Sequence, residues 1–130
     1  MTARVAGARD VALNEMNFRG FVINTAETAI TLVASDSGIM FLQNYATACT
    51  YTLPDVATGA GKMFMFSNIN TAARTVVTST TALIKGCSTA GAACTTLTDG
   101  SMGNFLWIVG DGSYWYVISG FSGTVWAVTT

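Results

Sequence analysis

The chain has 130 residues, a formal net charge of −1 and only 10% charged residues, whereas 51% of its residues are hydrophobic. This length suits one domain with a buried core, and the few scattered basic residues argue against binding to nucleic acid or to an anionic membrane. Typical soluble proteins carry about 25% charged residues, and charge keeps isolated molecules apart, so the composition indicates a protein that works in contact with other protein subunits. The alternative is a weakly charged monomer.

The first 19 residues differ in composition from the rest of the chain. They contain three of the six basic residues and a thin set of apolar ones; the residues of interest are Arg4, Arg9, Val11, Phe18 and Arg19. A helical turn near their middle is too brief a pattern to support a prediction. We therefore expect an N-terminal arm over residues 1–19 that reaches a partner, joined to one domain over residues 20–130. The alternative is a frayed terminus without a role.

The N-terminus does not resemble a targeting segment. Residues 1–10 contain no apolar run that could form the core of a signal peptide. No segment approaches the roughly 18 consecutive apolar residues of a membrane helix. We therefore expect synthesis in a cytoplasm and no membrane partner.

From Gly20 onward, short runs of β-branched and aromatic residues alternate with Gly, Asp, Asn and Pro, which predicts strands separated by turns. The expected strands cover residues 21–23, 29–33, 39–42, 50–53, 63–66, 75–77, 82–84, 95–97, 104–109, 113–118 and 124–128. Asp111-Gly112 marks a hairpin between two of them. Turns recur every 8–12 residues and no amphipathic helix is evident after residue 19, which predicts an all-β fold with a single antiparallel β-sandwich.

The three cysteines are Cys49, Cys87 and Cys94, and an odd number argues against a disulfide framework. Cys87 and Cys94 flank a short loop of small residues and form the candidate pair for one disulfide across a hairpin mouth. Closing this loop would stabilise the fold by about 2–3 kcal/mol in the chain-entropy model. The alternative is that all three are buried thiols that pack as small apolar groups.

Catalytic and metal-binding patterns are absent from the sequence. The chain contains no histidine, which excludes Ser-His-Asp and Cys-His nucleophiles and histidine metal sites. Gly59-Ala60-Gly61-Lys62 resembles the end of a phosphate-binding loop, but Val56 stands where that motif needs glycine and Met63 where it needs Ser or Thr. We expect no enzyme activity, no metal and no cofactor.

The carboxylates also fit a structural role. Asp36, Asp55, Asp99 and Asp111 each lie near glycine or proline in an expected turn, where Asp is favoured because its side chain bonds nearby backbone groups. A pair of carboxylates that face each other across a glycan, as in glycosidases, is the alternative.

Aromatic residues concentrate in the last third of the chain, and those of interest are Trp107, Tyr114, Tyr116 and Trp126. Alternation places apolar side chains on both faces of the strands 104–109 and 113–118. Since one face of a sandwich strand is usually polar, the second apolar face favours an interface between subunits. The alternatives are a well-packed core with Tyr at its rim and an aromatic platform that stacks on sugars.

The order of several short motifs resembles the β-rich module of tailed-bacteriophage virion proteins, which includes small capsid decoration (cement) proteins and parts of head and tail fibres. The motifs span about residues 29–120 and are Asp36-Ser37-Gly38, Leu53-Pro54, Gly61 before Phe64-Met65-Phe66-Ser67-Asn68, Leu83-Ile84-Lys85-Gly86, and Asp111-Gly112-Ser113-Tyr114-Trp115-Tyr116-Val117.

The resemblance implies a jelly-roll-like sandwich that forms homotrimers on the outer surface of the virion, where it binds the major capsid protein and stabilises the phage head. It also implies that Arg4, Arg9 and Arg19 pair with acidic capsid residues, since guanidinium groups bind carboxylates in a fork geometry. The alternative function is a receptor- or glycan-binding module of a phage fibre or tail.

Overall fold

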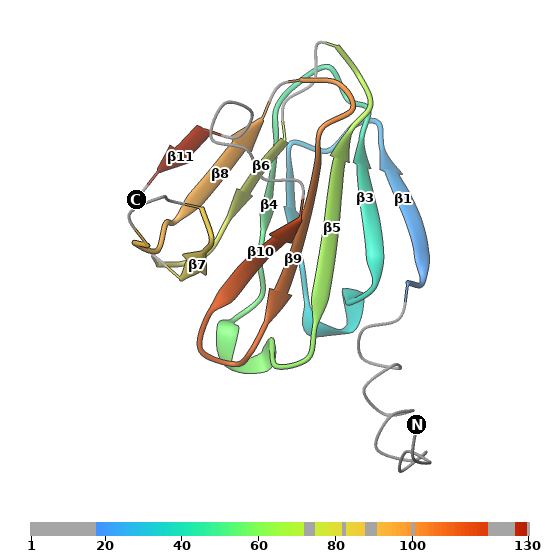
Figure 1. Cartoon of the computed structure of the whole chain (residues 1–130). Helices are drawn as coiled ribbons and strands as arrows, with labels where there is room; N and C mark the ends of the chain where they lie inside the picture. Colours follow the sequence, from blue (N-terminus) through green and yellow to red (C-terminus); the bar gives the residue numbers. More distant parts are fainter. Residues whose placement is uncertain are drawn as a thin grey trace, which may run out of the picture.

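The computed structural model describes residues 18–71, 75–81, 83–87, 91–99, 101–119 and 127–129 (Figure 1). The strands are β1 (Gly20–Asn24), β2 (Ala29–Thr31), β3 (Ile39–Gln43), β4 (Cys49–Thr52), β5 (Met63–Asn68), β6 (Thr75–Thr78), β7 (Ile84–Lys85), β8 (Thr96–Asp99), β9 (Phe105–Gly110), β10 (Trp115–Ser119) and β11 (Ala127–Thr129). Two 3-10 turns, η1 (Ala34–Asp36) and η2 (Val56–Thr58), are the helical elements of the described residues. The all-β prediction is confirmed.

The strands form two sheets that pack against each other as the layers of a sandwich (Figure 1). The six-stranded sheet has the order β1-β3-β5-β9-β10-β7, and the five-stranded sheet has the order β11-β8-β6-β4-β2. Strand β1 begins at Gly20, where the expected domain begins. The remainder of the expected arm, residues 1–17, lies outside the described residues.

The chain winds between the two sheets instead of turning back within one. Strands β1, β3 and β5 enter the first sheet, and β2, β4 and β6 enter the second, so that the chain crosses over after each strand. Two crossings return it to the same sheet in its original direction, which makes β1-β3, β3-β5, β2-β4 and β4-β6 parallel. We call these six strands the coiled part of the fold.

The expected antiparallel pairing is therefore wrong for much of the fold. Of the nine pairings between named strands in the described residues, five are parallel and four are antiparallel. The antiparallel pairs are β5-β9, β9-β10, β6-β8 and β8-β11, which close the sandwich after the coiled part. Because a jelly roll needs antiparallel neighbours, the jelly-roll arrangement is not confirmed.

The core lies between the sheets and is rich in aromatic rings. Phe41, Tyr51 and Phe66 come from three different strands, and their ring centroids lie 5.3–5.9 Å apart. Phe64 contacts Trp115 edge to face at 5.6 Å. Aromatic pairs of this geometry contribute about 0.5–1.5 kcal/mol beyond the burial of their area.

A polar network closes one end of the core. The buried amide Oε1 of Gln43 accepts hydrogen bonds from Asn24 Nδ2 and from the Tyr51 hydroxyl, both at 2.8 Å. Gln43 Nε2 donates to the carbonyl oxygen of Thr47 at 3.0 Å. Burial raises the pKa of Tyr51 and of the neighbouring thiol, Cys49, so both groups stay neutral and the network lies within the core without an ionised member.

Two glycines receive the indole ring of the fully buried Trp115. A Cβ atom at Gly59 would lie 2.5 Å from Trp115 Cη2, and one at Gly110 would lie 2.7 Å from Trp115 Cζ3. Neither position tolerates a side chain without movement, so Gly59 and Gly110 let the β9–β10 hairpin approach the loop after η2.

Candidate interaction surface

The outer face of the six-stranded sheet is apolar across five neighbouring strands. Side chains alternate between the faces of a strand, so that every second residue of β1, β3, β5 and β9 points away from the core, as does Tyr116 of β10, which precedes the register shift of that strand. These residues define the outer apolar face: Phe21, Ile23, Met40, Leu42, Met63, Met65, Ser67, Phe105, Trp107, Val109 and Tyr116. Only Ser67 among them has an aliphatic hydroxyl, and none carries a formal charge at neutral pH.

The strand register aligns these side chains into rows. One row contains Phe21, Met40, Met65 and Trp107 as successive partners on four strands. Met65, in the middle of the row, is only 6% exposed, and Met63 on the same strand is 3% exposed. Phe21, at the edge of the sheet, is 60% exposed. The face is thus a continuous apolar surface whose edge is open to solvent.

Sequence reasoning identified part of this face. Trp107 and Tyr116 lie on it as two of the predicted interface residues, and Tyr114 lies beside it in the hairpin. Trp126 lies outside the described residues. The contributions of Phe21, Met40 and Met65 were missed, although the runs 21–23, 39–42 and 63–66 are apolar at every position and therefore leave no polar residue for an outer face.

A cluster of polar and aromatic groups flanks the face at the β9–β10 hairpin. The Tyr116 hydroxyl donates to Asp111 Oδ2 at 2.9 Å, and Lys85 Nζ lies 3.9 Å from the centroid of the Tyr114 ring. The Tyr114 and Tyr116 rings meet edge to face at 6.4 Å. We call these four residues the hairpin cluster.

Hydrogen bonds shift the titration of two groups in the hairpin cluster. The backbone N–H groups of Tyr114 and Ser113, together with the Tyr116 hydroxyl, hold the pKa of the Asp111 carboxyl below its usual range. The same hydroxyl has a raised pKa because it donates to that carboxylate. At neutral pH Asp111 is therefore a carboxylate and Tyr116 a neutral phenol.

The predicted arm residues have different outcomes. Phe18 is 55% exposed. The Arg19 guanidinium donates to the carbonyl oxygens of Ser35, at 2.6 Å, and Ser37, at 3.4 Å, so that it holds β1 against the loop at η1. Arg4, Arg9 and Val11 lie outside the described residues.

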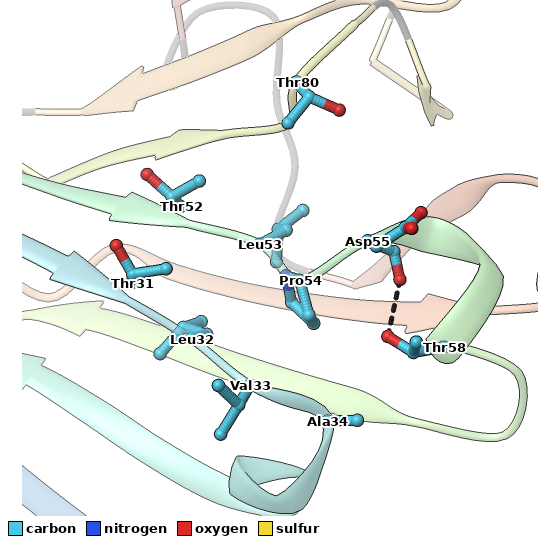
Figure 2. A pocket seen from close by; sticks show the side chains of 10 residues that line it. All are labelled: Thr31, Leu32, Val33, Ala34, Thr52, Leu53, Pro54, Asp55, Thr58 and Thr80. Carbon is cyan, nitrogen blue, oxygen red and sulfur yellow. Dashed lines mark hydrogen bonds between the residues drawn. The ribbon is translucent and has the colours of Figure 1, made fainter.

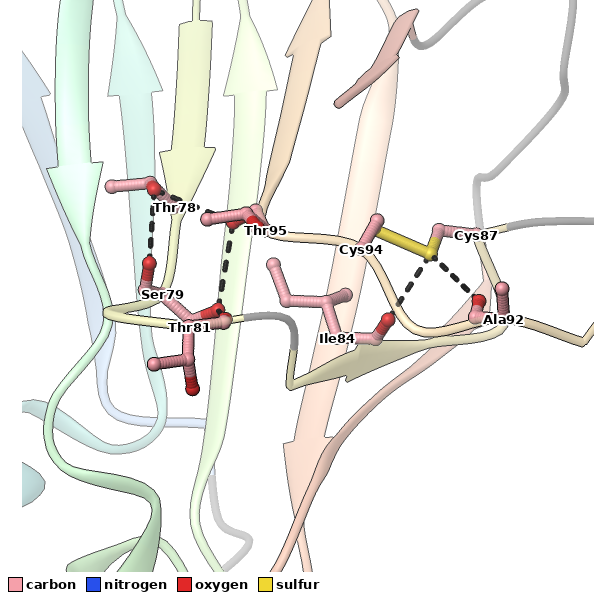
Figure 3. Close-up of a disulfide and its surroundings, with 8 residues drawn as sticks. All are labelled: Thr78, Ser79, Thr81, Ile84, Cys87, Ala92, Cys94 and Thr95. Carbon is pink, nitrogen blue, oxygen red and sulfur yellow. Dashed lines mark hydrogen bonds between the residues drawn. A yellow bond between two sulfur atoms is a disulfide. The ribbon is translucent and has the colours of Figure 1, made fainter. Parts of the chain in front are cut away.

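The structure joins Cys87 and Cys94 in a disulfide, with their Cα atoms 6.6 Å apart (Figure 3). The bond lies beside the paired backbones of Ile84 and Cys94, which exchange two hydrogen bonds of 3.0 and 2.8 Å. It therefore links β7 to the approach to β8. Cys49 is a free, buried cysteine.

An open pocket of about 460 Å³ lies where β2 and β4 end (Figure 2). It is lined by Thr31, Leu32, Val33, Ala34, Thr52, Leu53, Pro54, Asp55, Thr58 and Thr80. Asp55 Oδ1 accepts from the backbone N–H of Ala57 at the start of η2, and the Thr58 hydroxyl donates to the Asp55 carbonyl oxygen. The polar groups at this end of the pocket thus serve the local turn.

The turn carboxylates bond to backbone groups, as their sequence context suggests. Asp36 accepts from the N–H of Val33, Asp99 from that of Ser101, and Asp111 from those of Ser113 and Tyr114. Among the described side chains, no three His, Cys, Asp or Glu residues lie close enough to hold a metal ion. Within the same residues, no helix has the length and apolarity to cross a membrane.

Neither the comparison with protein-family models nor the comparison with curated proteins finds a match for this chain.

Proposed function

We propose that this chain is a structural subunit that binds other protein subunits through the outer apolar face. The observation that carries the proposal is the continuity of this face, which extends over five strands without a charged side chain. Exposed apolar patches that exceed a few hundred Å² are characteristic of interaction sites. The turn roles of Asp36, Asp55 and Asp111, and a chain without histidine, support a role without catalysis.

The size of the face indicates how it would be used. Five strands at about 4.8 Å spacing and five residues at about 3.3 Å each give a surface of roughly 20 by 17 Å. A standard protein interface buries about 800 Å² on each partner. Because Met63 and Met65 within this footprint are already buried, the face supplies less than half of one. A subunit with such a face gains stable attachment when further contacts or many equivalent copies add to it.

A tailed-phage capsid decoration protein is the specific role that we propose. It is supported by the order of motifs that resembles phage virion proteins, by the low charge and by the outer apolar face. In this role the chain binds the major capsid protein on the outside of the head and associates as a homotrimer. Residues 1–19 then extend the contact beyond the sheet. Arrayed copies add buried interface that must be broken before the shell opens.

Co-sedimentation with empty shells assembled from the major capsid protein of the same phage genome tests this role. We expect the chain to pellet with the shells, and Met40→Lys to weaken this binding at least tenfold, because it places a charge in the middle of an apolar contact. Thr50→Lys is the matched control, since Thr50 is a half-buried, outward-facing residue of β4 in the other sheet. Absence of binding by the unmodified chain, or equal binding by Met40→Lys, contradicts the proposal.

The hairpin cluster favours a second candidate function, a receptor- or glycan-binding module of a fibre or tail. Tyr114 and Tyr116 offer rings for stacking on sugars, and Asp111 and Lys85 offer hydrogen-bonding groups beside them. Binding to a glycan array that Tyr114→Ala abolishes, together with no binding to shells, would replace the decoration role with this one.

A further inference from the structure

Within the described residues, strand β1 forms an edge of the six-stranded sheet and pairs on one side only, with β3 (Figure 1). Three successive side chains of this strand are exposed: Phe21 by 60%, Val22 by 46% and Ile23 by 46%. Phe21 and Ile23 belong to the outer apolar face. Since side chains alternate along a strand, Val22 points to the other side of the sheet. Strand β1 is therefore apolar and open to solvent on both of its faces.

The backbone of β1 offers hydrogen-bonding groups along its open edge. The carbonyl oxygen of Asn24 accepts from the N–H of Asn44, on the side of β3, at 3.0 Å. The N–H and C=O of one strand residue point to the same side, and the side alternates from residue to residue. The groups of Val22 therefore also face β3, and those of Phe21 and Ile23 face the open edge. Two donors and two acceptors in this arrangement are what an added strand pairs with.

Strand β1 lacks the features that usually protect an open edge. Proteins keep their edge strands short or place charged residues, proline or a bulge on them. The other edge strands of the described residues, β2, β7 and β11, have three, two and three residues, whereas β1 has five. Strand β1 contains no charged residue and no proline, and its register with β3 has no shift. Such an edge indicates a site for another strand.

A second copy of β1 satisfies the open edge. When the two strands run antiparallel about a two-fold axis at Val22, Phe21 of each copy lies opposite Ile23 of the other. The groups that face the open edge then exchange four hydrogen bonds. An aromatic residue opposite a β-branched one is a favourable cross-strand pair. Because the strand carries no charge, two identical copies meet without like-charge repulsion.

Continuity with the outer apolar face also favours a second copy as the partner. Opposite residues of an antiparallel pair lie on the same face of the sheet. The outer apolar faces of the two copies therefore lie on the same side and join at Phe21 and Ile23. One face alone supplies less than half of a standard interface, and the joined faces form a surface about twice as wide. A strand of an unrelated protein would cover the edge without extending the face in this way.

We propose that β1 is a self-association site, at which two copies of this chain pair their β1 strands antiparallel about Val22. The two six-stranded sheets then form one sheet that is continuous across both copies. Two-fold contacts that use the same surface on both partners are the commonest kind between identical chains. The contact is five residues long, so it is weak in solution and becomes effective when copies are held close together. It does not depend on the capsid role, in which it would link one homotrimer to the next.

Disulfide trapping of the full chain with Val22→Cys tests the pairing. Residue 22 lies opposite itself across the two-fold axis as a non-hydrogen-bonded pair, with Cα atoms about 4.5 Å apart, and a disulfide spans this distance. With oxidised glutathione, we expect the folded variant to form a covalent dimer on non-reducing electrophoresis. The unmodified chain should not, because Cys49 is buried and Cys87 and Cys94 are bonded to each other.

Two cysteine controls separate strand pairing from random collision. Val33→Cys places a thiol at a residue that is 52% exposed and lies outside β1. Phe21→Cys places a thiol on β1 itself, but the pairing sets residue 21 opposite residue 23, so that the two thiols are too far apart to bond. We expect both controls to form at least tenfold less dimer than Val22→Cys.

A second pair of variants tests the backbone contact directly. Ile23→Pro removes an N–H that faces the open edge and leaves the pairing with β3 intact, as proline is tolerated at such edge positions. Ile23→Ala removes the same apolar side chain and keeps the N–H. Combined with Val22→Cys, the proline variant should form at least tenfold less dimer than the alanine variant. Far-UV circular dichroism and thermal melting verify that each variant is folded.

Two results would overturn the proposal. One is a yield of covalent dimer from folded Val22→Cys that does not exceed the yield from the controls, which would leave the open edge to a strand of another protein. The other is equal trapping with Ile23→Pro and Ile23→Ala, because a contact that does not use the edge N–H is not strand pairing. All of these measurements are made without capsid shells, so a failure of shell binding does not affect them.

Discussion

The contact between Gly59 and Trp115 gives a sharp test of how the hairpin is held. Gly59 has an ordinary backbone conformation, with φ −92° and ψ 0°, so alanine there creates no backbone strain. Its new Cβ would lie 2.5 and 2.7 Å from Trp115 Cη2 and Cζ2, about 1 Å closer than ordinary contact. Overpacking of this kind costs about 1–3 kcal/mol. With a urea m-value of about 1.5 kcal/mol/M, a 2 kcal/mol loss lowers the midpoint by roughly 1.3 M.

The structure also predicts which substitution relieves the clash. Phenylalanine at position 115 lacks the outer ring atoms that meet the new Cβ, so we expect Gly59→Ala with Trp115→Phe to be less destabilising than the sum of the single changes by about 1–2 kcal/mol. Urea unfolding followed by far-UV circular dichroism measures all four proteins without relying on the indole.

Gly110→Ala provides the comparison for this double-mutant cycle of Gly59→Ala and Trp115→Phe. A Cβ at Gly110 would meet the backbone carbonyl of Gly59 as its nearest neighbour, and backbone cannot yield as a side-chain tip does. We expect little rescue of Gly110→Ala by Trp115→Phe. If the Gly59→Ala and Trp115→Phe effects add within about 0.5 kcal/mol, the proposed contact between indole and glycine does not limit stability.

Three further outcomes follow from the core and the disulfide. Replacing both Cys87 and Cys94 with Ala removes the cross-link of a short loop and should lower the free energy of unfolding by about 2.5 kcal/mol in the chain-entropy model; an unchanged urea midpoint would contradict this. Tyr51→Phe removes one of two donors to Gln43 Oε1 and should cost about 0.5–1.5 kcal/mol in the same assay, whereas no loss would mean that the hydroxyl is dispensable. The raised pKa values of Cys49 and Tyr51 favour the neutral groups in the folded state. The free energy of unfolding should therefore be highest below the unfolded thiol pKa of about 8.5 and fall as the pH rises above it. Chemical denaturation at pH 8–10 measures this decline, and Cys49→Ala should flatten its first part.

The sequence predicted the strands better than their arrangement. Leu53-Pro54 and Asp111-Gly112 mark ends and turns through local backbone chemistry, and β4 does end at Thr52 while the β9–β10 hairpin turns at Asp111. A turn shows that the chain changes direction but does not show which sheet the next strand enters. Parallel pairs such as β1-β3 arise from crossings between layers, and no local pattern distinguishes these crossings from hairpins.

The prediction of which residues share an outer surface is limited in the same way. Trp107 and Tyr116 could be assigned to an apolar outer face because their own hairpin was evident. Met40 and Met65 join that face only through the register of β3 and β5, which depends on contacts distant in sequence.

The coiled part of the fold also suggests how such a chain can change in length. Gly20 and Ile39 are register partners although 19 residues separate them, so each further coil of about that size would add one strand to both layers at once. An inserted coil would widen the outer faces of the six-stranded and the five-stranded sheet by the same step, about 4.8 Å, while the closing strands stay as they are. Growth of the two opposite surfaces is thereby coupled, and neither can be enlarged by a new coil without the other.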